Sequence, residues 1–507
     1  MAPEPAPAGG TLILKYPSAS LTPSMSVSRR RFLAGSAALA LSPASRAEAA
    51  PRRAPSPFML DDASRLNETP ISRQAILTSA QDSPLLRDLR ATLGEAASEG
   101  RAVAMGGARH SMGGQSLPRY GIAASLATPA IEPDTQARVY RVSAGARWRD
   151  VIRVLDPLGF SPKVTQSNHD FSVGGTLSVN AHGWPVPFGP FGGTVRRFRI
   201  MLADGSVVTC SDSENADLFR LVVGGYGLFG IVIDAELAMA DNELLIGQSE
   251  LMRADAFASR FVARVRNPAA RMAYGRLSVA REGFLQEALL TAFRPAPHQP
   301  ARLPPPKESA AFSFVSRGVF RAQTGSDRGK EARWIAETRL LPRLGRVAVT
   351  RNTLLNSPVA ELKDGDASRT DILHEYFVPP DRFADFLAAC RDIIPAHRQD
   401  LLNVTLRYVD SDSSSVLAYA PQPRIAAVML FVQKRTAEAD DDMRAMTVKL
   451  IDRTLALGGS YYLPYRLHAT RAQLRAAYPR LDEFITAKRR YDPQLRFRNA
   501  LWDRYLA

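Results

Sequence analysis

Cysteine is scarce in this sequence, which has only Cys210 and Cys390 among its 507 residues. Two cysteines can form at most one disulfide. One bond between them therefore remains possible, but a framework of several disulfides is excluded. The sequence also has no CxxC pair and no cluster of histidine and cysteine. A structural zinc site is therefore not expected, and the sequence predicts no metal ligands.

Long hydrophobic runs are absent as well. No stretch of about 18 uninterrupted apolar residues occurs, so a membrane-spanning helix is not expected. Hydrophobic residues make up 45% of the chain and charged residues 23%, which are values typical of globular proteins. A chain of 507 residues is longer than a single hydrophobic core usually accommodates, so two domains are expected.

The net charge of +15 raises the question of a nucleic-acid partner. The arginines are scattered singly through most of the chain, and no motif interleaves aromatic with basic residues. The sequence therefore predicts a generally basic surface that faces anions, and no nucleic-acid binding.

Residues 1–49 have the layout of an export signal. Arg29 and Arg30 precede a short apolar run over residues 33–41, and Ala47 and Ala49 form a small-residue cleavage site. The arginine pair predicts the twin-arginine route and a periplasmic or secreted enzyme that acquires its cofactor before export. A basic disordered tail is the alternative.

The rest of the chain alternates predicted strands and helices and favours an α+β fold. Hydrophobic periodicity and turn residues predict strands at 75–77, 102–105, 138–144, 198–202, 206–209, 231–233, 374–378, 404–409 and 426–432. They predict helices at 83–100, 148–158, 380–394 and 438–457. The proline-rich stretch 295–306 is expected to be a surface loop.

Three glycine-rich segments carry the functional signal: residues 106–115, 172–183 and 224–230. Glycines after a strand let the backbone approach a ligand closely, and consecutive N–H groups can hold a pyrophosphate. No G-x-G-x-x-G segment opens a helix followed by an acid about twenty residues later, so a Rossmann site is not favoured.

In this order and spacing, the segments resemble the PCMH-type FAD-binding half of the vanillyl-alcohol oxidase family, over about residues 65–240. That family includes cytokinin dehydrogenases, alditol and aldonolactone oxidases and decaprenylphosphoryl-ribose oxidases. The resemblance implies an FAD-binding domain at 65–240, a substrate domain on an antiparallel sheet at 241–479, and a tail at 480–507 that returns to the first domain. It implies these cofactor-binding residues: Gly106, Gly107, Ala108, Arg109, His110, Ser111, Gln115, Gly174, Gly175, Thr176, Ser178, Ala181, His182, Gly183, Gly225, Gly230, Ile231 and Asn499.

The sequence from His110 to Gln115 reads His-Ser-Met-Gly-Gly-Gln. In the family that it resembles, the histidine of His-Ser-x-x-Gly-Gln is bonded to the flavin, which implies a covalent FAD on His110. A histidine that contacts FAD without a bond is the alternative. A second, cysteinyl attachment is not expected, because residues 166–170 contain no cysteine.

The C-terminal region is similar to the sugar-oxidising branch. Where those relatives have Glu-x-Arg, this chain has Thr405-Leu406-Arg407, and Tyr465 and Arg466 stand where they place a lysine. These departures put a plain alditol or lactone substrate in doubt. Arg407 could also be an ordinary surface arginine of a strand.

The resemblance implies oxidation of a CH–OH group of a small, sugar-like substrate by hydride transfer to flavin N5. Tyr465, His468 and Arg407 are the candidates for polarising or deprotonating the substrate, with Arg466 or Arg407 lowering the pKa of Tyr465. His374-Glu375-Tyr376 is the alternative place for the pocket. O2 or a redox protein would take the electrons. Amine oxidation and a role in electron transfer alone are the rival functions.

Overall fold

The computed structural model describes residues 58–308, 317–340, 348–359 and 366–507. The export signal predicted at residues 1–49 lies outside these residues. Among the helices of the described part, none is both long and apolar enough to cross a membrane. Cys210 and Cys390 are both buried and free, so no disulfide joins them.

The first sheet is parallel, with the strand order β3-β5-β4. Helix α1 turns Leu85, Leu89 and Leu93 toward it, because residues four apart share one face of a helix. The elements are β3 (Arg73–Leu77), α1 (Asp82–Ser98), β4 (Val103–Met105) and β5 (Ile122–Leu126), preceded by the hairpin of β1 (Phe58–Leu60) and β2 (Thr69–Ile71).

A six-stranded antiparallel sheet follows, in the order β10-β9-β11-β7-β6, with β8 paired to β11. Its strands are β6 (Ile131–Asp134), β7 (Val139–Ser143), β8 (Phe160–Pro162), β9 (Val195–Met201), β10 (Val207–Ser211) and β11 (Ile231–Asp241), and its helices are α2 (Trp148–Leu155), α3 (Val173–Val179) and α4 (Ala216–Val222). The predicted helix 148–158 ends early as α2 and continues as a 3-10 turn, Asp156–Leu158. Pro157 has no N–H to continue the α-helical pattern.

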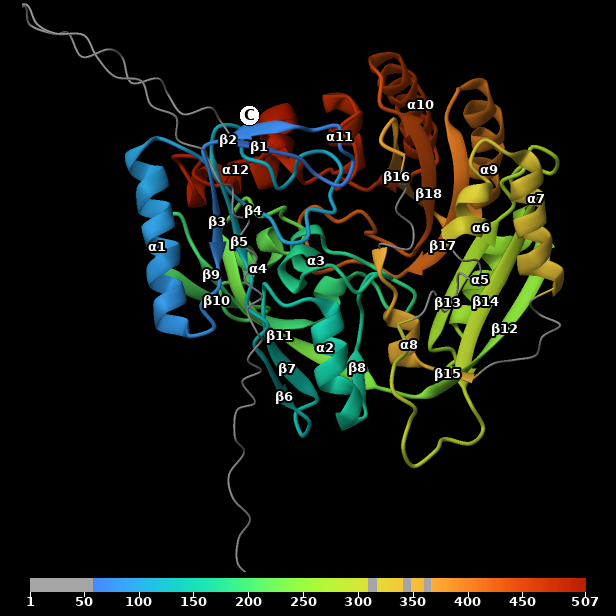
Figure 1. The fold of residues 1–507 in the computed structure, drawn as a ribbon, viewed down its shortest axis with the longest axis horizontal. Coiled ribbons are helices and arrows are strands. Elements are labelled where there is room, and N and C mark those ends of the chain that lie inside the picture. Colours follow the sequence, from blue (N-terminus) through green and yellow to red (C-terminus); the bar gives the residue numbers. More distant parts are fainter. Residues whose placement is uncertain (1–57, 309–316, 341–347, 360–365) are drawn as a thin grey trace, which may run out of the picture. The chain divides into compact units, whose positions relative to one another are not determined.

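An eight-stranded antiparallel sheet occupies the second half of the chain, in the order β15-β12-β14-β13-β17-β18-β16-β19. Helices α9 and α10 lie beside β16 and β18 (Figure 1). The strands are β12 (Leu244–Arg253), β13 (Met272–Leu277), β14 (Glu287–Pro295), β15 (Ala348–Thr350), β16 (Arg369–Val378), β17 (Asp400–Val409), β18 (Arg424–Lys434) and β19 (Ser460–Tyr461). The helices of this half are α5 (Phe257–Val265), α6 (Arg317–Ala322), α7 (Asp327–Ile335), α8 (Arg351–Leu355), α9 (Phe383–Ile393) and α10 (Ala437–Ala456).

Helix α11 (Arg471–Ala477) precedes the C-terminal tail. The tail contains α12 (Leu481–Tyr491) and packs against the first sheet through a bridge between Phe497 and Val103. Lys488 is fully buried, where it pairs with Asp492 and donates to the carbonyl of Leu228 at 2.6 Å. The tail therefore holds the third glycine segment in place.

The predicted α+β fold class is confirmed. Each predicted strand lies within or overlaps an observed one, and residues 296–306 form a connection without helix or strand. Strands β12 and β14, which form much of the large sheet, are not among the predicted strands.

Candidate active site

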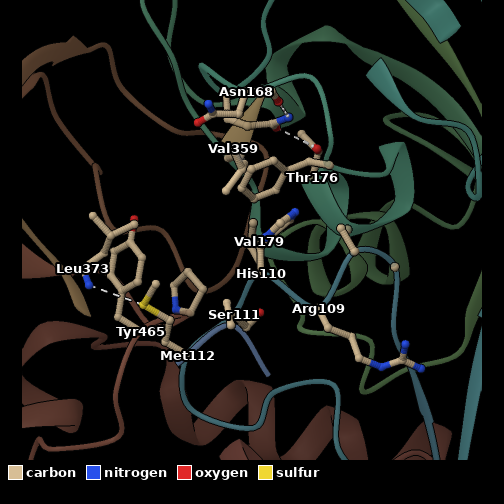
Figure 2. A pocket seen from close by; sticks show the side chains of 18 of the residues that line it. Arg109, His110, Ser111, Met112, Asn168, Thr176, Val179, Val359, Leu373 and Tyr465 are labelled. Carbon is tan, nitrogen blue, oxygen red and sulfur yellow. Dashed lines mark hydrogen bonds between the residues drawn. The ribbon is translucent and has the colours of Figure 1, made fainter. Parts of the chain in front are cut away.

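A cavity of about 850 Å³ lies between the glycine segments and one face of the eight-stranded sheet. Such a volume is at the upper end of the range for ligand sites. In Figure 2, Thr176 and Asn168 lie at one end of the cavity, Tyr465 and Leu373 at the other, and His110 between them. The cavity therefore has a side built of glycine segments and a side built of the sheet.

The first glycine segment leaves β4 and keeps its backbone open to the cavity. Gly106 donates its N–H to Ala124, but the N–H groups of Gly107, Ala108 and Ser111 donate to no group in the described part of the chain. A Cβ on Gly107 would meet the Ser172 hydroxyl at 2.0 Å, so no larger residue fits there. These free donors fit the pyrophosphate of FAD.

Arg109 brings a buried cation to the same wall. Its backbone is left-handed, with φ 53°, and its Nε and Nη2 atoms are buried without a hydrogen-bond partner. Burial first, and then the charge of Arg147, lower the pKa of its guanidinium. A buried cation without an anion is costly, which fits a phosphate group bound at this point.

The second segment turns into α3 with Ser172 as its N-cap, whose hydroxyl accepts from Gly175 N at 3.2 Å. Thr176 is fixed by two side chains, accepting from Trp148 and donating to Gln166, each at 2.8 Å. Ser178 is tied to the third segment because its carbonyl accepts from Tyr226 N. The three segments thus form one continuous wall.

His110 lies on this wall next to Phe171, with ring centroids 4.3 Å apart and ring planes inclined by 35°. The following residues are joined to the C-terminal region: Met112 N donates to the Pro464 carbonyl at 2.8 Å, and Gln115 donates to the Tyr465 carbonyl at 3.0 Å. His110 is therefore held where the glycine side of the cavity meets the sheet side.

On the sheet side, the buried Glu375 of β16 links two other polar groups. One carboxylate oxygen lies 2.5 Å from Nε2 of His182, and the other accepts from the Tyr465 hydroxyl at 3.1 Å. Arg407 of β17 donates to the His182 carbonyl at 3.1 Å and to the Ser167 hydroxyl at 2.9 Å. These residues of the Glu375 cluster all line the cavity.

Burial favours the neutral form of Glu375, but the His182 and Arg407 charges and the Tyr465 hydrogen bond outweigh it. The pKa of this carboxyl therefore lies below its usual value. Burial first, and then the Glu375 charge, raise the pKa of Tyr465 well above its usual value, although Arg407 acts in the opposite sense. Arg407 lowers the pKa of Tyr465 as expected, but burial and the adjacent carboxylate outweigh it, so the net shift is upward.

Most of the predicted residues come together in the cavity. Those that line it are Gly106, Gly107, Ala108, Arg109, His110, Ser111, Gln115, Gly174, Gly175, Thr176, Ser178, Ala181, His182, Gly230, Arg407 and Tyr465.

Six predicted residues lie outside the lining. Asn499 acts behind the wall, donating to the carbonyls of Gln115 and Tyr226, and Ile231 is fully buried in the core. Gly183 and Gly225 serve close backbone packing, because an added Cβ would lie 2.0 Å from Thr165 O and 2.1 Å from Leu221 O, respectively. The remaining two are Arg466 and His468.

Arg466 and His468 face a different carboxylate. Arg466 donates to Asp440 at 2.8 Å, and Nε2 of His468 lies 3.6 Å from the same carboxylate. Neither lines the cavity, so the geometry does not bring them to the predicted substrate chemistry. Arg466 and His468 follow Tyr465 closely in the sequence, but the loop after Tyr465 turns their side chains toward α10.

The sequence prediction missed several lining residues, among them Phe171, Tyr226, Arg276 and Arg333. It named Glu375 only as part of an alternative location. The observed cavity contains both locations, since Glu375 and Tyr465 share a hydrogen bond. Because side chains alternate along a strand, the predicted strand 374–378 places Glu375 on the opposite face of the sheet from His374 and Tyr376. Alternation does not predict which of the two faces contacts Tyr465.

Comparison with known proteins agrees with this geometry. Residues 86–211 match the FAD binding domain family. Cytokinin dehydrogenase 1 of Arabidopsis thaliana is 35% identical over 148 residues, which are 27% of this chain and 25% of that protein. Cytokinin dehydrogenase 4 of Oryza sativa subsp. japonica is 32% identical over 198 residues, which are 36% of this chain and 37% of that protein.

The chain is thus matched to only 25% and 37% of the length of these curated relatives. This chain thus carries a PCMH-type FAD-binding domain and is distantly homologous to the cytokinin dehydrogenases.

Proposed function

We propose that the protein is an FAD-dependent oxidoreductase that oxidises a CH–OH group of a small, sugar-like substrate. The observation that carries this proposal is the Glu375 cluster, which faces the cofactor wall across one cavity. When bound, FAD would accept the hydride at N5. The chain's own residues must orient the substrate and remove its hydroxyl proton.

Tyr465 and Glu375 together provide a route for that proton. A neutral tyrosine with a raised pKa is a poor base by itself. It can, however, accept the substrate proton on its oxygen while passing its own proton to the Glu375 carboxylate, 3.1 Å away. His182 holds the other carboxylate oxygen, and Arg407 holds the His182 carbonyl, so both position the pair.

We further propose that FAD is covalently attached through His110. Support comes from the complete His110-to-Gln115 sequence and from the place of His110 between the two sides of the cavity. Hydrogen bonds to residues 463–465 fix the backbone around it. Attachment would keep the cofactor in place after export.

We also propose export by the twin-arginine route, on the strength of Arg29-Arg30 and the apolar run after them. Replacing both arginines with lysine should leave the precursor in the cytoplasm. Unchanged export of the double variant would contradict the proposal. After export, O2 or a redox protein outside the cytoplasm would reoxidise the flavin.

Amine oxidation is the second candidate. The relatives named above are cytokinin dehydrogenases, and a buried carboxylate with a lowered pKa, as in Glu375, could bind or deprotonate an amine. A flavoprotein that only transfers electrons would need no such cluster.

An anaerobic screen of flavin absorbance separates these functions. Polyols, sugars, sugar acids and sugar phosphates should bleach the flavin if CH–OH oxidation is the activity, and isopentenyl-adenine should bleach it if the amine function is. The absence of bleaching by either panel would overturn both and favour electron transfer alone.

A further inference from the structure

A row of four side chains crosses the cavity face of the eight-stranded sheet. Arg276 of β13 pairs with Thr405 of β17, Thr405 with Val428 of β18, and Val428 with Glu375 of β16. Directly paired residues point to the same side of a sheet, and all four line the cavity. At about 4.8 Å between strands, the two ends of the row are about 14 Å apart at the backbone.

Arg276 lies beside a second arginine at its end of the row. Arg333 of α7 also lines the cavity, and both guanidinium groups converge on one oxygen of Glu337, at 3.2 Å from Arg276 and 2.7 Å from Arg333. Glu337 does not itself line the cavity. Two cations thus share one carboxylate that lies behind them, and this part of the wall keeps a positive charge.

The neighbouring acids do not cancel that charge. Asp371 is paired with Arg321, whose Nη1 lies 2.8 Å from it, and Glu375 is engaged by His182 and Tyr465. The side chains of Arg276 and Arg333 are 16% and 8% exposed. Their field is therefore weakly screened by solvent.

Arg276 also has donors to spare. Of its five N–H donors, one on Nη2 donates to Glu337, while Nε is buried without a hydrogen-bond partner in the described part of the chain. A buried guanidinium with unused donors is destabilising unless a ligand completes its hydrogen bonds. Trp184 and Tyr274, stacked with ring centroids 4.8 Å apart, line the cavity as well and offer a flat surface to a ring.

We propose that the substrate is an anion whose carboxylate or phosphate binds at Arg276 and Arg333, while its reacting carbon lies toward Tyr465 and Glu375. Arginine suits both groups, since its planar fork can donate two parallel hydrogen bonds. The placement of the reacting carbon rests on the proposed function, whereas the anion site is inferred from Arg276, Arg333 and Glu337 alone. The substrate is accordingly an elongated sugar acid or sugar phosphate rather than a neutral polyol.

The test is calorimetric binding to the oxidised, flavin-loaded protein without turnover, with glucose, glucuronate and glucose 6-phosphate as probes. Both charged probes should bind at least about 10-fold more tightly than glucose, and the stronger of the two identifies the group. Arg276→Gln should weaken the charged probes by roughly 10- to 100-fold, the range for hydrogen bonds to charged groups, and leave glucose unchanged. Arg281→Gln is the matched control, because that side chain is 90% exposed.

Glu337→Gln gives the sharper result, because it removes a negative charge and should tighten binding of both charged probes. If Glu337 only held the two arginines in place, its loss would instead weaken binding of the charged probes. Glu337→Gln therefore also tests the anion site if Arg276→Gln does not fold. Equal binding of all three probes, no binding of either charged probe, or weaker anion binding by Glu337→Gln would overturn the inference. The two proposals can fail separately. If only neutral alcohols reduce the flavin, the anion site is wrong and the proposed function stands. If the anions bind but no alcohol reduces the flavin, the proposed function is wrong and the anion site stands.

Discussion

The two sides of the cavity differ in how they are built. The cofactor side is made of backbone, with three glycine segments whose open N–H groups and close contacts tolerate little change. The sheet side is made of side chains that come from strands far apart in the sequence, such as β13, β16 and β17. The match to the FAD binding domain family, over residues 86–211, falls on the first side, which teaches that a cofactor domain by itself does not specify a substrate.

The largest effect should come from removing the residue that lies where the two sides meet. His110→Ala should lose covalent flavin completely, so that acid-precipitated protein turns colourless and shows no fluorescence on a denaturing gel. Wild type and the exposed control His298→Ala should both stay yellow. A colourless precipitate from fully loaded wild type would remove the covalent bond from the proposal but not FAD binding.

On the sheet side, Tyr465→Phe should slow flavin reduction by about 10²- to 10⁴-fold, the usual cost of losing a positioned proton acceptor. FAD content should be unchanged, because Tyr465 contributes to the substrate side. Stopped-flow absorbance under anaerobic conditions measures the rate. Tyr408→Phe is the control, since Tyr408 alternates with the cavity-lining Arg407 on β17. Normal reduction by Tyr465→Phe would place the proton route elsewhere.

Behind the cofactor side, Lys488→Met should lower the free energy of unfolding by about 3–5 kcal/mol. It leaves Asp492 buried without its cation and frees the Leu228 carbonyl. Urea denaturation compares it with Lys434→Met at an exposed strand end. The double variant Lys488→Met/Asp492→Asn removes the unpaired charge and keeps an amide oxygen for the N–H of Arg496, so it should recover part of the loss, and failure to recover would show that the unpaired charge is not its main cause.

The smallest effect is expected from His374, which alternates with Glu375 and lies away from the cavity. Burial lowers the pKa of His374 to about 3, with contributions from His468 and Arg466. Between pH 6.5 and 3 the unfolded chain binds a proton that the folded chain does not, so the free energy of unfolding falls as the pH falls. The slope is about 1.4 kcal/mol per pH unit for one such group.

His374→Gln should reduce that slope by about one proton, measured by urea denaturation at a series of pH values. His298→Gln, at an exposed position, should retain the wild-type slope. An unchanged slope in His374→Gln would assign the acid sensitivity to other groups, such as His468, whose pKa burial also lowers.

The cofactor side could be predicted from sequence because its signals are local. Glycines are required where Gly107 meets Ser172 and where Gly174 meets Ala144, and such close approaches leave a readable pattern along the chain. The predicted strands 198–202 and 206–209 form a hairpin through another local signal, because Gly205 adopts the positive φ of 80° that its turn requires.

The sequence by itself therefore determined the fold class, the FAD-binding segments and the place of His110 among them. Only the tertiary structure decided that Glu375 joins Tyr465, that Arg466 turns away to Asp440, and that Arg276 lies in one row with Glu375. The two placements of Glu375 depend on strand order and register, which bring together residues about 90 to 100 positions apart. Alternation along each strand is readable in the sequence, but which strands become neighbours is settled by packing of the whole sheet.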